Sequence, residues 1–284
     1  MIIYLNGEYV PAEEARVSVF DRGFLYGDGI YETLRVYGGR VFKLEEHLVR
    51  LERSAQLIHM DPPLSREAFT EAIDTCLKVN DLSDALVRIG VSRGEASEPG
   101  LDPALVAGPP TVVIAPRPFE PYPEAMYEAG IRASVVSVRR NPTEALNPAI
   151  KSTNFLNNIL AKMEALGAGA DEAIMLNTDG HIAEGTTTNI FWVAGYTLCT
   201  PPLEAGVLDG VTRSVTITLA EDLDCQILEV LRGQSALEEA EEVFVTSTSY
   251  EIMPVTSIDG KPVGSGRAGP MSLELLSKFR GLYW

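Results

Sequence analysis

The sequence of 284 residues has few of the side chains that bind metals or form disulfides, with three cysteines and three histidines. These are Cys76, Cys199, Cys225, His47, His59 and His181. They are far apart and have neither a CxxC nor a zinc-ligand spacing, so we expect no metal site and no disulfide framework. An odd and small number of cysteines is typical of a reducing compartment, which predicts a cytoplasmic protein.

Positive charge is also scarce, because 23 Lys and Arg residues stand against 40 Asp and Glu, a net charge of −17. Such a surface repels the phosphates of nucleic acids and the headgroups of anionic membranes, so we expect no nucleic-acid partner and no membrane partner. Residues 1–17 have neither a basic start nor a long apolar run. This beginning predicts no signal peptide and no membrane anchor.

Hydrophobic residues make up 45% of the chain and charged residues 22%, which is typical of a globular protein with a substantial core. Residues 117–124 contain three prolines within eight positions and favour a linker. The sequence therefore predicts an N-terminal domain over residues 1–116, a linker over 117–124 and a C-terminal domain over 125–284.

Hydrophobic periodicity and turn residues predict both helices and strands in each half of the chain. Asn6-Gly7 and Gly38-Gly39 predict two hairpins, joining residues 2–5 to 8–10 and residues 30–37 to 40–44. Predicted helices cover residues 45–58, 64–79, 152–166, 211–223 and 271–280. Predicted strands cover residues 85–93, 111–116, 131–138, 173–176, 181–183, 189–193, 243–246 and 252–255.

Lys151 lies at a predicted strand-to-helix junction, and Glu184 lies in the strand-turn-strand segment that follows. A lysine amine can form a Schiff base with the aldehyde of pyridoxal 5′-phosphate. A carboxylate can keep the pyridine nitrogen of that cofactor protonated, so that the ring acts as an electron sink. Either residue alone would be ordinary, because most lysines lie on the surface and a glutamate often caps or bridges. Their order and spacing together indicate a pyridoxal phosphate enzyme.

The phosphate of such a cofactor needs a firm anion site, and a helix N-terminus provides one through its unpaired amides and its dipole. The predicted helix that begins at Val211-Thr212 follows Asp209-Gly210, with Asp209 as the expected N-cap. Thr212 and Thr248 can add hydroxyl groups, and Arg50 can add a charged fork. The alternative interpretation is that these threonines are ordinary caps and that Arg50 lies on a solvated helix face.

These motifs, taken together, resemble the class IV aminotransferases, which are fold-type IV pyridoxal phosphate enzymes. The matching segments are residues 17–29, 45–51, 88–94, 147–158, 184–186, 210–213 and 245–254. The resemblance implies an α/β (α+β) fold with a small N-terminal α/β domain, a larger C-terminal α/β domain and the cofactor between them. It also implies a homodimer or higher homo-oligomer, in which the loop 24–28 reaches toward the neighbouring subunit's site.

The resemblance further implies a role for particular residues. Lys151 would be the Schiff-base lysine and the proton shuttle, and Glu184 would pair with the pyridine nitrogen. Four residues would hold the phosphate, namely Arg50, Val211, Thr212 and Thr248. Four others would line the substrate pocket, namely Tyr31, Leu86, Arg88 and Ser249.

The substrate motifs are divided between subfamilies. Residues 87–94, 100–103 and 139–151 are similar to branched-chain aminotransferases, in which an arginine at the Arg88 position helps to accept the carboxylate of glutamate. Leu86 and Phe155 depart from that pattern, because a tyrosine is usual at both positions. Residues 29–32 and 246–249 are instead similar to D-amino acid aminotransferases, although residues 94–100 lack the Arg-x-His carboxylate trap of that subfamily.

We therefore expect a transaminase that uses branched-chain or similar aliphatic L-amino acids and 2-oxoglutarate in a ping-pong cycle. The alternatives are a D-amino acid transaminase or an (R)-amine transaminase, followed by an aminodeoxychorismate lyase, which residues 32–37 also resemble. A carrier protein that only binds the cofactor is disfavoured, because storage alone would not require both Lys151 and Glu184.

Overall fold

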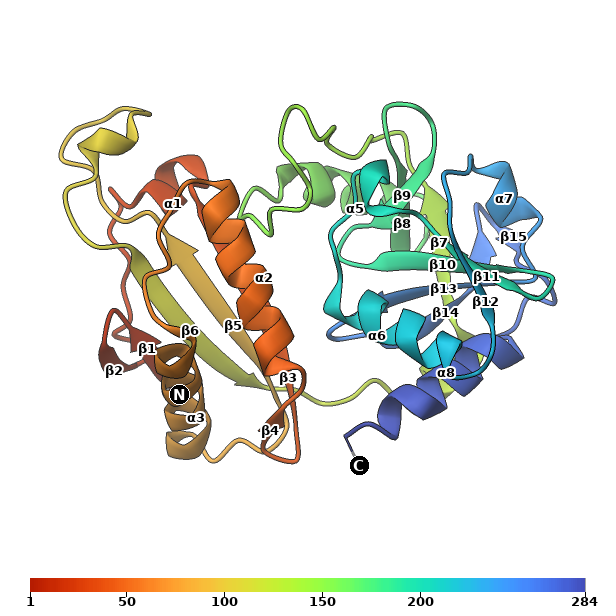
Figure 1. The fold of residues 1–284 in the computed structure, drawn as a ribbon, viewed down its shortest axis with the longest axis horizontal. Helices are drawn as coiled ribbons and strands as arrows, with labels where there is room; N and C mark the ends of the chain where they lie inside the picture. Colours follow the sequence, from red (N-terminus) through yellow and green to blue (C-terminus); the bar gives the residue numbers. More distant parts are fainter. Residues whose placement is uncertain (284) are drawn as a thin grey trace. The chain divides into compact units, whose positions relative to one another are not determined.

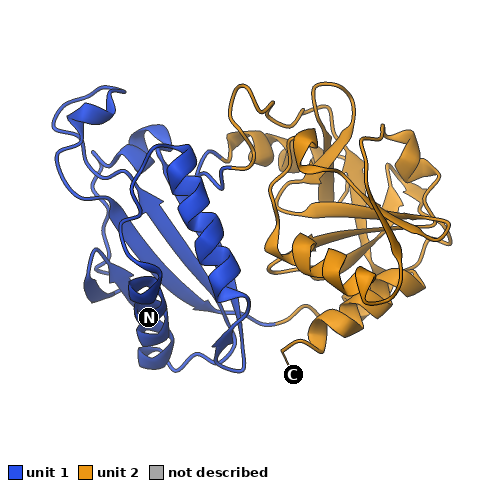
Figure 2. Cartoon of the chain, viewed as in Figure 1, with its two compact units in different colours: residues 1–120, 150–154 blue, residues 121–149, 155–284 orange. Residues whose placement is uncertain are grey.

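The computed structural model describes residues 1–283 (Figure 1). They divide into two compact units, which Figure 2 colours separately. Unit 1 consists of residues 1–120 and 150–154, and unit 2 consists of residues 121–149 and the chain from Phe155 on. Each unit combines helices with a β-sheet, which agrees with the expected α/β class.

Unit 1 is a six-stranded antiparallel sheet with the strand order β2-β1-β6-β5-β3-β4. Helices α2 and α3 pack on one face of this sheet (Figure 1). The elements are β1 (Ile2–Leu5), β2 (Glu8–Pro11), α1 (Arg22–Tyr26), β3 (Gly29–Tyr37), β4 (Arg40–Val41), α2 (Leu44–Leu57), α3 (Arg66–Val79), β5 (Ala85–Ser92) and β6 (Thr111–Pro118).

Alternation along β5 separates the two faces of this sheet. Val87 and Ile89 are fully buried in the core beneath the helices, whereas Leu86 and Arg88 point to the opposite face and remain more accessible. The first predicted hairpin is confirmed, with Leu5 paired to Glu8 and positive φ angles at the two turn residues. The second hairpin is shorter than expected, because β4 ends at Val41 and α2 begins three residues later.

The segment 150–154 belongs to unit 1, although the sequence places it in the C-terminal domain. The backbone N–H of Tyr31 donates to the carbonyl of Lys151 at 2.9 Å, and the N–H of Thr153 donates to the carbonyl of Gly29 at 2.9 Å. The segment thus extends the sheet beside the first half of β3, where the short β4 does not reach. These contacts also correct the predicted helix 152–166, which begins only at Leu156.

Unit 2 is built on a nine-stranded mixed sheet with the order β12-β11-β10-β13-β14-β7-β8-β9, and β15 pairs with β14. Helix α8 packs on β13 and β14 and against α6, and α5 packs on β7 and β8 (Figure 1). The elements are α4 (Glu124–Ala129), β7 (Ile131–Val135), α5 (Leu156–Gly167), β8 (Glu172–Leu176), β9 (Ile182–Gly185), β10 (Asn189–Ala194), β11 (Thr197–Thr200), α6 (Val211–Glu221), β12 (Gln226–Glu229), α7 (Ser235–Glu238), β13 (Glu242–Ser247), β14 (Glu251–Ile258), β15 (Lys261–Pro262) and α8 (Pro270–Arg280).

The centre of the unit 2 sheet is apolar, since Phe191 of β10 and Phe244 of β13 are fully buried and stack with ring centroids 5.1 Å apart. Within residues 1–283, no helix combines the length and the apolar character needed to cross a membrane.

The two faces of β5 predict unequal effects of truncation. Ile89→Ala should lower the free energy of unfolding by about 2–5 kcal/mol, because it opens a cavity in the closed core of unit 1. Leu86→Ala, three residues away on the other face, should lower it by a clearly smaller amount. Urea denaturation of the cofactor-free proteins measures both, and equal losses would contradict this assignment of the two faces.

Candidate active site

Lys151 lies beside the side chain of Tyr31 in unit 1. The Lys151 Nζ donates to the Tyr31 hydroxyl oxygen at 3.3 Å, and the Lys151 backbone N–H donates to the Ser54 Oγ at 3.1 Å. Tyr31 is 6% exposed, and burial raises the pKa of its hydroxyl to about 12. The phenol therefore keeps its proton at neutral pH and can act as a hydrogen-bond donor next to the lysine amine.

Arg88 of β5 completes this group from the neighbouring strand. Its guanidinium carbon lies 3.4 Å from the centroid of the Tyr31 ring, and its Nη1 donates to the Thr33 Oγ1 at 3.4 Å. Burial lowers the pKa of Arg88, but a guanidinium still carries its charge at neutral pH. No ion pair of Arg88 is found in the part of the chain that the structure describes, so an aromatic ring, not a carboxylate, is its main contact.

Arg50 of α2 is buried and forms an ion pair with Glu32 of β3. The Arg50 Nε and Nη2 donate to the two Glu32 oxygens at 2.7 and 2.8 Å, and the His47 Nδ1 lies 2.8 Å from Glu32 Oε2. Burial alone would raise the pKa of Glu32, but the charge and hydrogen bonds of Arg50, assisted by His47, hold it well below its usual range. Burial lowers the pKa of His47, so its neutral ring donates Nδ1–H to this carboxylate.

Arg50 thus lies in a buried charged cluster and not on a solvated helix face. The sequence analysis missed Glu32 and His47. The available signal was a charged residue between the apolar residues of a strand, together with a histidine one helical turn before Arg50.

Glu184 is 5% exposed on β9 of unit 2. Its Oε1 accepts from the Arg140 Nε at 2.7 Å, and its Oε2 accepts from the Leu208 backbone N–H at 2.9 Å. Arg140 is itself 9% exposed. The sequence analysis did not single out this arginine, because nothing local links it to a glutamate 44 positions later.

The N-terminus of α6 is open to an anion. Its N-cap is Gly210, which has no side chain to bond the first amides, so the expected capping by Asp209 is wrong. A Cβ at Gly210 would lie 1.9 Å from the Asn189 Oδ1, so only glycine fits there. The first turn contains no acidic residue, and it begins with Val211 and the buried Thr212. Such a helix end can hold a phosphate.

Thr248 and Ser249 lie half-buried in the turn between β13 and β14 of unit 2. Ser249 also lines a cavity of about 290 Å³ in this unit, together with Phe155 and Thr186. The structure therefore places Glu184, Val211, Thr212, Thr248 and Ser249 in unit 2. It places the other predicted site residues in unit 1, namely Tyr31, Arg50, Leu86, Arg88 and Lys151.

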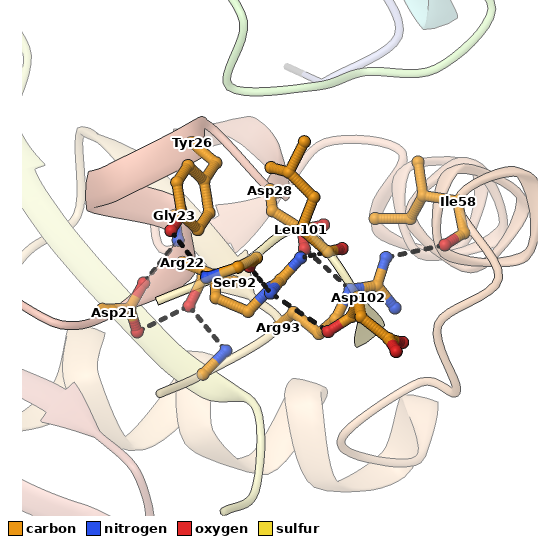
Figure 3. A network of polar contacts seen from close by, with 12 residues as sticks. Asp21, Arg22, Gly23, Tyr26, Asp28, Ile58, Ser92, Arg93, Leu101 and Asp102 are labelled. Carbon is orange, nitrogen blue, oxygen red and sulfur yellow. Dashed lines mark hydrogen bonds and ion pairs between the residues drawn. The ribbon is translucent and has the colours of Figure 1, made fainter. Parts of the chain in front are cut away.

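The loop before β3 is fixed by a second charged network, shown in Figure 3. Asp28 accepts from the Nε of Arg22 and from the Nε of Arg93, both at 2.8 Å. Arg22 also donates to the carbonyls of Gly100 and Leu101 at 2.9 and 3.0 Å. Burial would raise the pKa of Asp28, but the hydrogen bonds from the two arginines lower it overall. The loop predicted to be shaped is therefore tied firmly within unit 1.

A sequence model of the family described as amino-transferase class IV matches residues 29–258, which is most of the chain. The chain belongs to the class IV aminotransferase family. This membership confirms the resemblance predicted from the motifs and the expected enzyme class.

Relatives of this aminotransferase have three different named activities. A putative branched-chain-amino-acid aminotransferase of Methanocaldococcus jannaschii is 44% identical and aligns over 99% of this chain and 96% of its own length. An aminodeoxychorismate lyase of Bacillus subtilis is 37% identical, over 98% of this chain and 94% of the lyase. A D-alanine aminotransferase of Staphylococcus haemolyticus is 35% identical, over 98% of this chain and 96% of the relative.

Solved structures agree with the fold of this aminotransferase. The branched-chain amino acid aminotransferase of Escherichia coli superimposes with a TM-score of 0.93 at 34% identity, over 99% of this chain and 94% of that one. A second branched-chain enzyme, solved with pyridoxamine 5′-phosphate and given the source T.th., has a TM-score of 0.94 at 34% identity, over 98% and 92% of the two chains. The fold-type IV architecture expected from the motifs is confirmed.

The buried ion pair of Glu32 predicts a specific pH dependence of stability. The folded-state pKa of Glu32 is lowered, whereas an unfolded glutamate titrates near 4.3. Its stabilising effect is therefore fully present above about pH 4.5 and is lost as the pH falls toward the folded pKa. Glu32→Gln should lower the free energy of unfolding at pH 7 by about 3–5 kcal/mol, because it leaves Arg50 buried without its carboxylate.

Denaturation of the cofactor-free protein between pH 7 and pH 3 measures this difference, which should shrink toward acid pH. Glu71→Gln, at an exposed glutamate of α3, is the matched control and should follow the wild type. A difference between wild type and Glu32→Gln that does not change with pH would refute the ionised pair.

Proposed function

We propose that this chain is a pyridoxal phosphate-dependent transaminase for branched-chain or similar aliphatic L-amino acids, with 2-oxoglutarate as the acceptor in a ping-pong cycle. Family membership, the branched-chain relative and the branched-chain structures support this proposal. When bound, the cofactor supplies an electron sink for the negative charge that develops at the substrate Cα. Everything else must come from side chains of the protein.

The observation that carries the proposal is the contact of Lys151, Tyr31 and Arg88 in unit 1. An amine that can bind an aldehyde lies 3.3 Å from a protonated phenol, and a guanidinium stacks 3.4 Å from the same ring. A substrate carboxylate bound here would meet one neutral donor and one cation close to the reacting amine. This is the arrangement that an amino acid and its 2-oxo acid both require.

Lys151 would hold the cofactor covalently through Nζ and carry the proton to and from the substrate Cα. Glu184, which Arg140 and the Leu208 amide hold in place, would face the pyridine nitrogen and favour its protonated form. The amides of Val211 and Thr212, with Thr248 and Arg50, would bind the phosphate. These assignments are consistent with the open α6 N-terminus, where glycine alone fits at the cap.

On the substrate side, Arg88 would accept the second carboxylate of 2-oxoglutarate or glutamate. Leu86 shares its face of β5 and would give apolar contact to an aliphatic side chain. Ser249, in the turn of unit 2, would add a hydroxyl. One surface carrying both a cation and an apolar side chain suits the two different substrates of a ping-pong cycle.

A homodimer or higher homo-oligomer is part of the proposal. Val19, Phe20 and Phe24 are 62%, 64% and 72% exposed, which is unusual for clustered apolar side chains and favours burial against a second copy. We also propose a cytoplasmic location, which the three unpaired cysteines support.

Removal of the lysine amine tests the proposed chemistry directly. Lys151→Ala should abolish transamination of leucine, because no other amine would hold the cofactor and move the proton. Borohydride treatment of the cofactor-loaded wild type should leave the cofactor attached to the peptide that contains Lys151, as read by mass spectrometry. Lys78→Ala, at an exposed lysine of α3, should keep full activity. Wild-type turnover by Lys151→Ala would end this proposal.

Removal of the Arg88 guanidinium tests the substrate assignment. Arg88→Ala should raise the KM for 2-oxoglutarate by about one to two decades, since hydrogen bonds to charged groups contribute roughly 1.5–3 kcal/mol. The KM for leucine should change far less. Arg117→Ala, on the neighbouring strand, removes an exposed cation and should change neither value.

Steady-state kinetics of both half-reactions measure these constants. Equal damage to both half-reactions would remove Arg88 from dicarboxylate recognition. Turnover of D-alanine without turnover of L-leucine would instead favour the D-amino acid alternative, and release of pyruvate from aminodeoxychorismate would favour the lyase.

A further inference from the structure

Glu251, the first residue of β14, has an unusual backbone conformation. Its φ angle is +58°, in the left-handed region. Seven residues other than glycine have a positive φ within residues 1–283, and five of them are Asn, Asp or His, which tolerate it best. The other two are Lys43, which is not buried, and Glu251, which is 7% exposed. A buried glutamate in this conformation must be held there by its surroundings.

The position of Glu251 explains why a left-handed residue is needed. It pairs with Ser247 of β13 across a three-residue turn, and such hairpin loops characteristically end in a left-handed residue, usually glycine. The turn contains Thr248 and Ser249, the proposed phosphate and substrate ligands. Its first half has its own hydrogen bond, from the Tyr250 N–H to the Ser247 Oγ at 3.1 Å. Its second half depends on Glu251.

Both oxygens of the Glu251 carboxylate are held by residues from outside the hairpin. Oε2 accepts from the Arg280 Nε at 2.9 Å and lies 3.5 Å from the Tyr127 hydroxyl, and Oε1 accepts from the Tyr283 hydroxyl at 2.8 Å. Arg280 also lies 4.6 Å over the Tyr127 ring. Burial would lower the pKa of Arg280, but Glu251 raises it overall, and burial and Glu251 both raise the pKa of Tyr127. These donors therefore keep their protons across the working pH range.

We propose that the Glu251 carboxylate, clamped by Arg280 and Tyr283 near the C-terminal end of α8, is a positioning group that imposes the left-handed backbone and so fixes the turn carrying Thr248 and Ser249. The identity of the two ligands rests on the proposed function, whereas the clamp itself does not. Without the carboxylate, a residue with a Cβ would leave the left-handed region and shift the turn. A glycine would stay in that region without any clamp.

Two substitutions at one position separate the clamp from the conformation it imposes. In Glu251→Ala the strained backbone loses its anchor, so cofactor affinity, measured by equilibrium dialysis, should fall by about tenfold or more. In Glu251→Gly the anchor is also lost but the conformation is allowed, so affinity should recover most of that loss. Hydrogen exchange of the amides of residues 247–251 in the cofactor-free protein should rise in the alanine variant and less in the glycine variant.

Two further variants keep the test decisive. Tyr283→Phe removes one clamp hydroxyl and should give a smaller change in the same direction, which can be read even if Glu251→Ala fails to fold. Glu124→Gln removes the exposed partner of Arg280, 2.7 Å from its Nη1, without touching Glu251, and should match the wild type.

Wild-type exchange and affinity in Glu251→Ala would overturn the proposal, and so would a glycine variant as impaired as the alanine variant. A wild-type protein that binds no cofactor would refute the proposed function. The exchange rates in the cofactor-free variants would then still decide the clamp.

Discussion

Two backbone hydrogen bonds to β3 determine where Lys151 lies. They attach the segment 150–154 to a strand edge that is vacant only because β4 is two residues long and α2 begins directly after it. A longer β4 would occupy that edge and exclude the segment. The location of the proposed catalytic amine thus depends on an early helix start more than a hundred residues before it.

The alternation of β3 then distributes the charges of unit 1. Glu32 points toward α2 and enters the core layer, where only a bidentate contact with Arg50 makes its charge tolerable. Tyr31 and Thr33 point to the other face, where they meet Arg88. Arg50 is therefore pre-oriented by a carboxylate, whereas Arg88 stacks on an aromatic ring. An arginine that stacks on a ring retains its full charge for a second anion, which is the property required for recognition of a dicarboxylate.

Local signals in the sequence predicted much of the fold but not the contacts between distant segments. Helical periodicity predicted α2 and α3 to within two residues, whereas α5 starts four residues late because residues 151–153 bond to β3. The strands β11 and β12 were missed because four residues carry too little periodicity. Glu32 and Arg50 are 18 positions apart, and Arg140 and Glu184 are 44 apart, so no spacing rule connects them. Individual site residues were predictable because their motifs are local, but the partners that orient them are chosen by the packing of one element on another.

Similarity along the whole chain leaves the substrate open for a physical reason. Relatives with three named activities align over nearly the whole chain at 35–44% identity, so the shared residues specify the scaffold and not the substrate. Discrimination must come from the few side chains that reach the ligand. Leu86 has no hydroxyl where a tyrosine is usual in the branched-chain subfamily. In unit 1 the polar recognition of a carboxylate therefore falls on the hydroxyl of Tyr31 and the guanidinium of Arg88, which already touch each other. Two donors in contact bind one carboxylate more readily than two separated anions. This geometry favours alternate occupation by one substrate at a time, as a ping-pong cycle requires.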